Sequence, residues 1–225
     1  MSDTVDQLER ALKAANERVA RAVKALAPKH KGGEMAEFQA AVAEQLRLER
    51  EVALAKGEET AVVIDWRPRW DVGAPLPHVL SSGLRTILIY MVSEPDPAWD
   101  GSYANLVDPA SDASEPLAIV EFNHCYAHRF GGHNDEVIAG HPLYGKGLQA
   151  YRAHEVANSR WLASEQAINS VHRGYRPEAW TSLKHYLLEF HDEVFECLTK
   201  GYEVQLARCS FREAVDWAAG RLFEN

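Results

Sequence analysis

The sequence has few cysteines, and this shortage argues against a protein held together by disulfide bonds. Only three cysteines occur in 225 residues, namely Cys125, Cys197 and Cys209. Their odd number, wide spacing and lack of a CxxC pair do not fit a disulfide framework. We therefore expect free thiols in a reducing compartment, where buried cysteines act as small core residues.

Long apolar runs are also missing. No stretch approaches the roughly 20 apolar residues that a membrane-spanning helix needs. The first ten residues, MSDTVDQLER, are acidic and hold no apolar segment of the kind found in signal peptides. We therefore expect a cytoplasmic protein with no membrane partner.

Basic residues do not exceed acidic ones. The chain holds 24 Lys and Arg against 33 Asp and Glu, for a formal net charge of −9. Nucleic-acid binding depends on a basic surface that neutralises phosphates, so nucleic acid is not an expected partner. Residues 1–60 are nearly neutral, and the rest of the chain carries most of the negative charge.

No motif in the chain by itself identifies a reaction. The HExxH zinc signature, the GxSxG nucleophile elbow and the dinucleotide-binding glycine pattern are all lacking. Function must therefore be argued from clusters of side chains.

The first 57 residues predict a helical hairpin. Apolar residues recur at steps of three and four, which places them on one face of a helix; these are Val5, Leu8, Leu12, Ala15, Val19, Ala22 and Leu26. A second helix is expected over 34–55 and ends at Gly57. The apolar face could pack on the domain that follows, or on a second copy as an oligomerisation arm. We divide the chain into this hairpin, 1–57, and a domain, 58–225.

After residue 60 the apolar pattern has the period of two that strands show. Strands are predicted at 61–66, 84–92, 117–128 and 183–191, with a hairpin of 195–199 and 202–207 around Lys200-Gly201. Residues 94–116 are expected to form a long surface loop. Helices are predicted over 148–171 and from Ser210 to Leu222. Regular strand–helix alternation is absent, so we predict an α+β fold with a largely antiparallel sheet packed with helices.

The densest group of reactive side chains lies between Asn123 and His141. Four of the ten histidines fall in this run, together with Cys125, Asp135 and Glu136. Histidine titrates near neutral pH and is a common metal ligand. If 117–128 is one strand, His124 and His128 share a face but lie roughly 13 Å apart, too far for one metal unless the strand bends.

Two further groups could carry chemistry. In EFHDEVFE, the adjacent His191 and Asp192 resemble a histidine oriented by a carboxylate, but neighbours in a strand point to opposite faces, so the strand would have to bulge or end there. In the helix predicted over 148–171, the spacing places His154, Asn158 and Trp161 on one face. Each group could equally be a polar turn or a solvated surface.

The span from Leu117 to Cys197 resembles a bacterial protein family whose activity is not known. The matching string is approximately FxxC…FGxxNDE…GHPL…GL…EVxNSxW…FHDxxFEC. It covers about a third of the chain and leaves out the helical hairpin. His124, His128 and His133 fall outside it. The resemblance directs attention to nine positions: Cys125, Asn134, Asp135, Glu136, His141, Asn158, His191, Asp192 and Glu196.

Two classes of function fit these observations. One is an enzyme that acts on a small molecule by acid–base or metal-assisted chemistry, with His191, His141, Asp135 and Glu136 as catalytic residues. Binding residues would then be Cys125, Asn134, Asn158, Asp192 and Glu196. If a divalent metal is the cofactor, the two histidines are the expected nitrogen ligands. The other class is a non-catalytic module, of immunity or adaptor type, that binds a protein partner.

Overall fold

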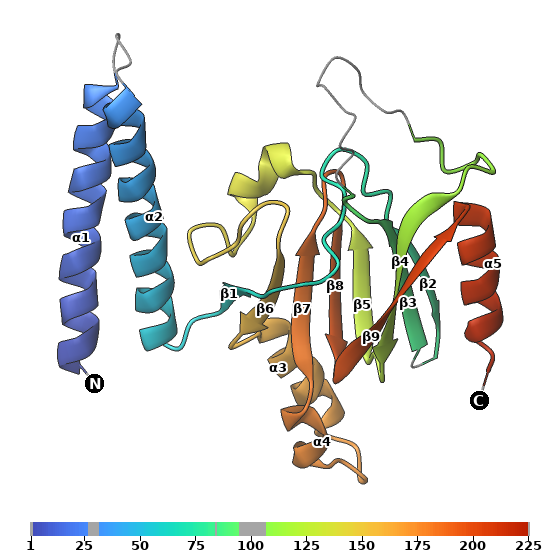
Figure 1. Ribbon diagram of the computed structural model, residues 1–225. Helices are drawn as coiled ribbons and strands as arrows, with labels where there is room; N and C mark the ends of the chain where they lie inside the picture. Colours follow the sequence, from blue (N-terminus) through green and yellow to red (C-terminus); the bar gives the residue numbers. More distant parts are fainter. Residues whose placement is uncertain (1, 27–31, 84, 95–106, 225) are drawn as a thin grey trace.

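The computed structural model describes residues 2–26, 32–83, 85–94 and 107–224 (Figure 1). Most of the loop predicted over 94–116 therefore lies outside the described residues, as does Leu84. The helices are α1 (Ser2–Ala25), α2 (Gly32–Ala55), α3 (Arg160–Asn169), α4 (Pro177–Thr181) and α5 (Phe211–Arg221), with a 3-10 helix η1 (Asp135–Gly140). Among these described helices, none is long and apolar enough to cross a membrane.

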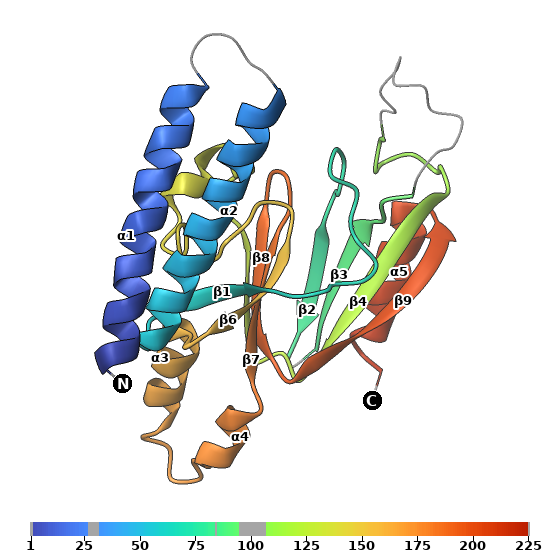
Figure 2. The same cartoon turned by 60° about the vertical axis from the view of Figure 1, so that its left-hand side comes forward.

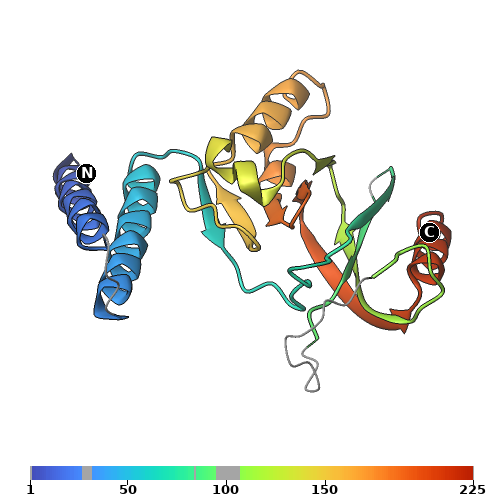
Figure 3. The same ribbon diagram turned by 90° about the horizontal axis from the view of Figure 1, so that it is seen from above.

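Nine strands form two antiparallel sheets, which confirms the predicted α+β class. The strands are β1 (Thr60–Val63), β2 (His78–Ser82), β3 (Arg85–Met91), β4 (Glu115–Asn123), β5 (Ala127–Gly131), β6 (Ala153–Ala157), β7 (Lys184–Glu189), β8 (Val194–Thr199) and β9 (Gly201–Cys209). One sheet has the order β1-β6-β7-β8-β5 and the other the order β2-β3-β4-β9. The two sheets lie side by side at an angle (Figure 3).

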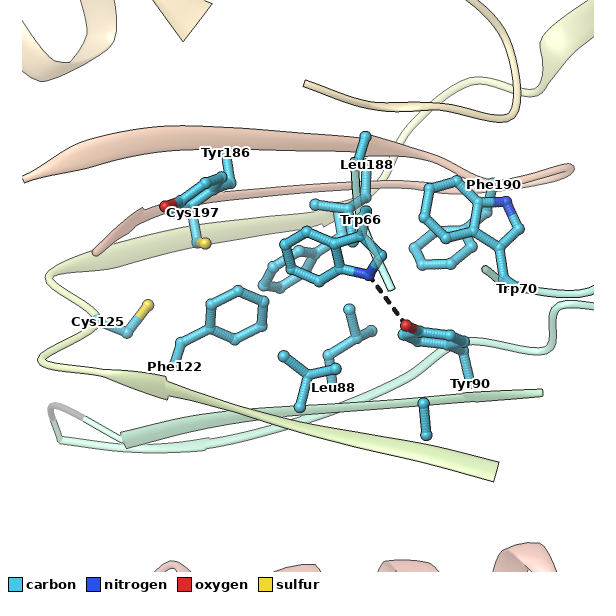
Figure 4. Packing of buried hydrophobic residues seen from close by; sticks show 14 residues of the cluster. Trp66, Trp70, Leu88, Tyr90, Phe122, Cys125, Tyr186, Leu188, Phe190 and Cys197 are labelled. Carbon is cyan, nitrogen blue, oxygen red and sulfur yellow. Dashed lines mark hydrogen bonds between the residues drawn. The ribbon is translucent and has the colours of Figure 1, made fainter. Parts of the chain in front are cut away.

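The main core fills the space between the two sheets, because alternate residues of each strand point inward. From the five-stranded sheet come Tyr186, Leu188 and Phe190, and from the other Leu88 and Phe122 among others (Figure 4). A buried hydrogen bond of 2.9 Å, from the Trp66 indole N–H to the Tyr90 hydroxyl, satisfies the polar atoms of two large aromatic residues.

The outer faces of the sheets are covered differently. Helix α5 packs on the four-stranded sheet through Phe211, Ala214 and Ala218. It begins at the predicted residue, Ser210, in a capping box with Glu213. The five-stranded sheet is covered by the loop around η1, where Leu143 and Leu148 pack on Val156 and Leu187.

The predicted helical hairpin is confirmed. Helix α1 packs along α2 with Ala15 and Ala22 buried, and Arg18 forms a 2.8 Å ion pair with Glu37 across the pair (Figure 2). Helix α2 in turn lies against the loop that covers the five-stranded sheet, where Arg50 approaches Gly147.

The prediction of one strand over 117–128 is wrong beyond Asn123. The chain turns at His124, which has the left-handed φ of 53°, and continues as β5 in the other sheet. The backbone N–H of Tyr126 donates to Leu198 O at 2.7 Å and begins this new pairing. His124 and His128 therefore do not share one face of a single strand.

The prediction of a helix over 148–171 is wrong in its first half. Strand β6 occupies Ala153–Ala157 and pairs with β1 and β7, and α3 begins only after Ser159. His154, Asn158 and Trp161 therefore do not share a helical face. Pairing with strands distant in sequence outweighs the local helical pattern here.

The hairpin predicted around Lys200-Gly201 is also wrong. Strand β8 pairs with β5 and β7, whereas β9 pairs with β4 in the other sheet. The short turn is a corner between sheets, where Lys200 N–H donates to Asn123 O at 3.4 Å. Strand β2 and helix α4 were not predicted.

Candidate functional site

The outer face of the five-stranded sheet carries an unusual number of polar side chains. Alternation on β7 turns His185, Leu187 and Glu189 away from the main core. The register places His154 of β6 and Glu196 of β8 on either side of Leu187. The loop above them contributes His133 and His141. We call these six residues the polar layer: His133, His141, His154, His185, Glu189 and Glu196.

Glu189 is the most unusual member of the polar layer. It is completely buried, and neither carboxylate oxygen has a hydrogen-bond partner. His133 Nε2 lies 3.5 Å from Glu189 Oε1. Burial raises the pKa of Glu189 from its usual 4.5 to about 7, and the negative charges of Glu196 and Asp135 add to this effect. Glu189 can therefore gain or lose a proton near neutral pH.

Asp135 and His191 meet beside this carboxyl group. The turn that follows β7 brings His191 Nδ1 within 3.5 Å of Asp135 Oδ1, and Asp135 N–H donates to His191 O at 3.2 Å. The Tyr151 hydroxyl donates a hydrogen bond to the other Asp135 oxygen. This bond is the main reason why the pKa of Asp135 is lowered, with a smaller contribution from His191.

The pKa of His191 is shifted in the opposite direction from those of His141 and His154. Its pKa is raised, first by interaction with its own backbone and then, against some desolvation, by the nearby carboxylates of Asp192 and Asp135. Burial lowers the pKa of His141, and of His154 to about 4. The site thus favours the charged form of His191 beside Asp135 and disfavours the charged forms of His141 and His154.

His141 lies toward His133 rather than in a contact with His191. The His133 and His141 rings are 5.2 Å apart, and His141 Nδ1 accepts a 3.1 Å hydrogen bond from Leu143 N–H. That His141 and His191 lie near one another, in a pocket with Asp135 or Glu136, therefore stays a prediction: His141 contacts His133, and His191 contacts Asp135.

A pocket of about 300 Å³ lies next to Tyr151, the residue that donates a hydrogen bond to Asp135. Tyr151 lines it, and Trp66 and Trp70 supply aromatic surface. Two cationic residues, Arg69 and Arg152, and one acidic residue, Asp65, also line it. Arg152 is also tied to the polar layer, because Glu189 N–H donates to Arg152 O at 3.1 Å.

The remaining predicted residues lie outside this group of contacts. Glu136 is exposed on η1, and Asn134 precedes that helix without capping it. Asn158 holds the chain in place by donating to Glu58 O at 3.1 Å. Asp192 is exposed, 3.8 Å from His191.

Cys125 and Glu196 lie on opposite sides of the five-stranded sheet. Cys125 is buried in the main core beside Cys197 (Figure 4), away from the polar layer. Glu196 belongs to the layer and accepts a 2.8 Å hydrogen bond from His185 Nε2.

Sequence reasoning missed three residues of the site: Tyr151, His185 and Glu189. Strand alternation along 183–191 was the available signal for His185 and Glu189. Nothing in the sequence indicated that Tyr151 faces Asp135, because that contact joins two loops.

Metal binding at this site receives no geometric support. Within the described part of the chain, no three side chains of His, Cys, Asp or Glu are grouped so as to hold a metal ion. Compared with protein-family models, curated proteins and solved structures, the chain shows no significant match to any of them. The function must therefore be argued from the geometry alone.

Proposed function

We propose that the protein is an enzyme that performs general acid–base chemistry on a small anionic molecule. One observation carries the proposal. Of the seven buried side-chain N and O atoms that lack a hydrogen-bond partner within the described residues, five belong to His133, Asp135, Glu189 and His191. Folded proteins normally pair such atoms, because an unpaired buried polar group is destabilising. Four of the five face one another in two pairs 3.5 Å apart, His133 with Glu189 and His191 with Asp135. Their concentration in one place supports a site kept for a ligand.

The environments of the two carboxyl groups support distinct roles. Asp135 stays ionised because Tyr151 and His191 favour its charged form. Glu189 has a pKa of about 7 and exchanges its proton at neutral pH. Neighbouring carboxyl groups whose surroundings push their pKa values apart are characteristic of acid–base sites. Glu189 is thus the proposed proton donor and acceptor, and His191, oriented by Asp135, is the second acid.

The adjoining pocket supports the class of substrate. Its two tryptophans favour a planar or apolar body, and Arg69 and Arg152 favour a carboxylate or phosphate. Tyr151 and Arg152 connect the pocket to Asp135 and Glu189 through hydrogen bonds.

The test is calorimetric titration of the protein with a panel of small aromatic and aliphatic carboxylates and phosphates at pH 7. Binding should take up or release a proton, which appears as a heat that depends on the ionisation enthalpy of the buffer. Glu189→Gln should abolish this dependence, and Glu193→Gln, a half-buried glutamate of the same turn, should keep it.

Two results would contradict the proposal. One is wild-type protein that binds none of the panel and instead forms a stoichiometric complex with a protein, as an adaptor would. The other is stoichiometric bound metal that disappears in both His141→Ala and His191→Ala, because metal-assisted chemistry would then replace the proposed acid–base roles.

A further inference from the structure

Another group of linked hydrogen bonds lies at the opposite end of β7 from Glu189. The Ser159 hydroxyl and His185 Nδ1 are 2.8 Å apart, and His185 Nε2 is 2.8 Å from Glu196 Oε2. Burial raises the pKa of Glu196, but the hydrogen bond with His185 outweighs this effect, so the pKa lies below its usual value.

The ionised carboxylate fixes the tautomer of His185. A carboxylate only accepts hydrogen bonds, so His185 Nε2 carries the proton that Glu196 accepts. His185 Nδ1 then offers its lone pair to the Ser159 hydroxyl. This order of serine, imidazole and carboxylate is the one that activates a serine nucleophile.

The local backbone presents Ser159 at the start of a helix. Strand β6 ends at Ala157, Asn158 turns the chain with a φ of 53°, and Ser159 is the N-cap of α3. Its Oγ accepts a 3.1 Å hydrogen bond from Leu162 N–H. The positive end of the ten-residue helix favours negative charge that develops at this oxygen.

Helix capping alone does not explain this arrangement. Ser210 caps α5 with Glu213 and no histidine. At Ser159, in contrast, the buried His185 and the largely buried Glu196 accompany the capping serine. Buried ionic pairs rarely stabilise a fold better than apolar residues do, so stability alone does not account for these two side chains. The Trp161 ring packs at 84° to the His185 ring, 5.2 Å away, and Arg129 stacks 4.0 Å over Trp161, so the imidazole is held in place.

Ser159 and His185 also open onto a groove. They line a surface groove of about 410 Å³ together with residues such as Asn158, Gln166 and Lys184. Ser159, which is 8% exposed, therefore forms part of the wall of a groove large enough for a small ligand.

We propose that Ser159 is a catalytic nucleophile and that the protein hydrolyses small acyl esters at this groove. Ser159 Oγ attacks the ester carbonyl carbon while its proton passes to His185 Nδ1. The tetrahedral intermediate collapses, the ester C–O bond breaks, and the leaving alcohol takes the proton from His185. Water then attacks the acyl-serine with His185 as base, which releases the acid and restores Ser159. Glu196 acts as a positioning residue for His185.

The experiment is covalent labelling of the full chain with a fluorophosphonate probe, with the modified residue located by mass spectrometry. Hydrolysis of p-nitrophenyl acetate is measured in parallel. Wild-type protein should be labelled at Ser159. Ser159→Asn keeps an N-cap acceptor but has no hydroxyl, so both labelling and hydrolysis should disappear. His185→Gln should lower both rates by about 100-fold or more, the usual contribution of a general base.

Three controls separate this activity from structural effects and from the Glu189 site. Ser210→Asn changes the other N-cap serine and should leave labelling intact. Glu196→Gln should slow labelling, and Glu196→Asp should restore part of it. Glu193→Gln changes a half-buried glutamate beside the Glu189 site and should leave the labelling of Ser159 unchanged. Folded wild-type protein that is not labelled, or equal labelling of Ser159 in His185→Gln, would overturn the proposal.

Discussion

At the scale of single residues, Glu189 is the side chain that most needs an explanation. It is fully buried at the end of a central strand, and its oxygens have no hydrogen-bond partner. A carboxyl group in this position disfavours its own charged form, so it is destabilising above neutral pH. An apolar residue would pack there without this cost. We interpret Glu189 as a residue kept for chemistry at the expense of stability.

Glu189→Gln should therefore stabilise the folded protein above neutral pH. The folded state of the wild type keeps the Glu189 proton up to a pKa of about 7, whereas the unfolded chain loses it near 4.5. Stability from this group is fully present below 4.5 and is lost as the pH rises through 7. At pH 8 we expect the variant to be more stable by about 2 kcal/mol in urea unfolding.

The free energies of unfolding of the wild type and of Glu189→Gln must be compared as a difference at each pH. His154, with its pKa lowered to about 4, has the opposite effect, because its stabilising contribution is lost as the pH falls from 6.5 through 4. Subtracting the two stability curves removes the effect of His154. A flat difference between pH 4 and 8 would mean that Glu189 is solvated or paired in the folded protein.

The Asp135–His191 pair gives a second prediction at this scale. Asp135 contributes to the raised pKa of His191 by its charge and its proximity. Asp135→Asn should lower the pKa of His191, which can be followed by NMR of the imidazole C–H signals. An unchanged titration of His191 would show that the two side chains do not interact in solution.

At the scale of elements, the glycine-containing loop above the five-stranded sheet fixes the site. Lys146 O accepts a 2.9 Å hydrogen bond from Ala61 N–H, and Gly147 passes close to β1 with a φ of 100°. A Cβ atom at Gly147 would lie 2.1 Å from Ala61 O. Only glycine fits this position, and the close approach holds the loop that carries His133 and His141.

Gly147→Ala should therefore destabilise the protein strongly. We expect a loss of about 2–4 kcal/mol from the clash and the positive φ, seen as a fall of about 5–12 °C in Tm. Gly140→Ala is the matched control, since its Cβ would meet nothing within 4 Å, and it should change Tm little. Equal effects of the two substitutions would show that the loop does not pack on β1 in this way.

The elements that the sequence predicted are those whose pattern is local. The two long helices follow from the spacing of their apolar residues, and the final helix from Ser210. Strand β6 was missed because Ala153–Ala157 is held by β1 and β7, which are distant in sequence. The turn at His124 was missed because an apolar alternation does not reveal which residue takes a left-handed conformation.

The candidate site was predicted in part for the same reason. Asp135 and His191 were both expected, because polar residues after apolar strands often meet at the end of a sheet, and they lie 3.5 Å apart. Ser159, His185 and Glu196 were not predicted as a group. Their contacts depend on the register between β7 and β8 and on where α3 begins, and neither can be read from spacing along the chain.

At the scale of the whole molecule, the helical hairpin lies beside the domain that carries the site (Figure 2). It reaches the site loop through α2, where Glu49 and Arg50 approach Gly145 and Gly147. Deleting residues 1–57 should therefore lower Tm, and it should also change the oligomeric mass or the solubility. Light scattering and thermal unfolding of the truncated chain measure these effects. If the Tm, the oligomeric mass and the solubility all stayed as in the full chain, the hairpin would be dispensable.

The proposed acid–base chemistry depends on one property of the whole molecule, namely that the buried Glu189 exchanges its proton at neutral pH. The most direct test is the NMR titration of the Glu189 side-chain carboxyl carbon in the full-length protein, assigned by comparison with Glu189→Gln. We predict a pKa of about 7. A pKa near the ordinary 4.5 would contradict the acid–base role of Glu189 and with it the proposed function.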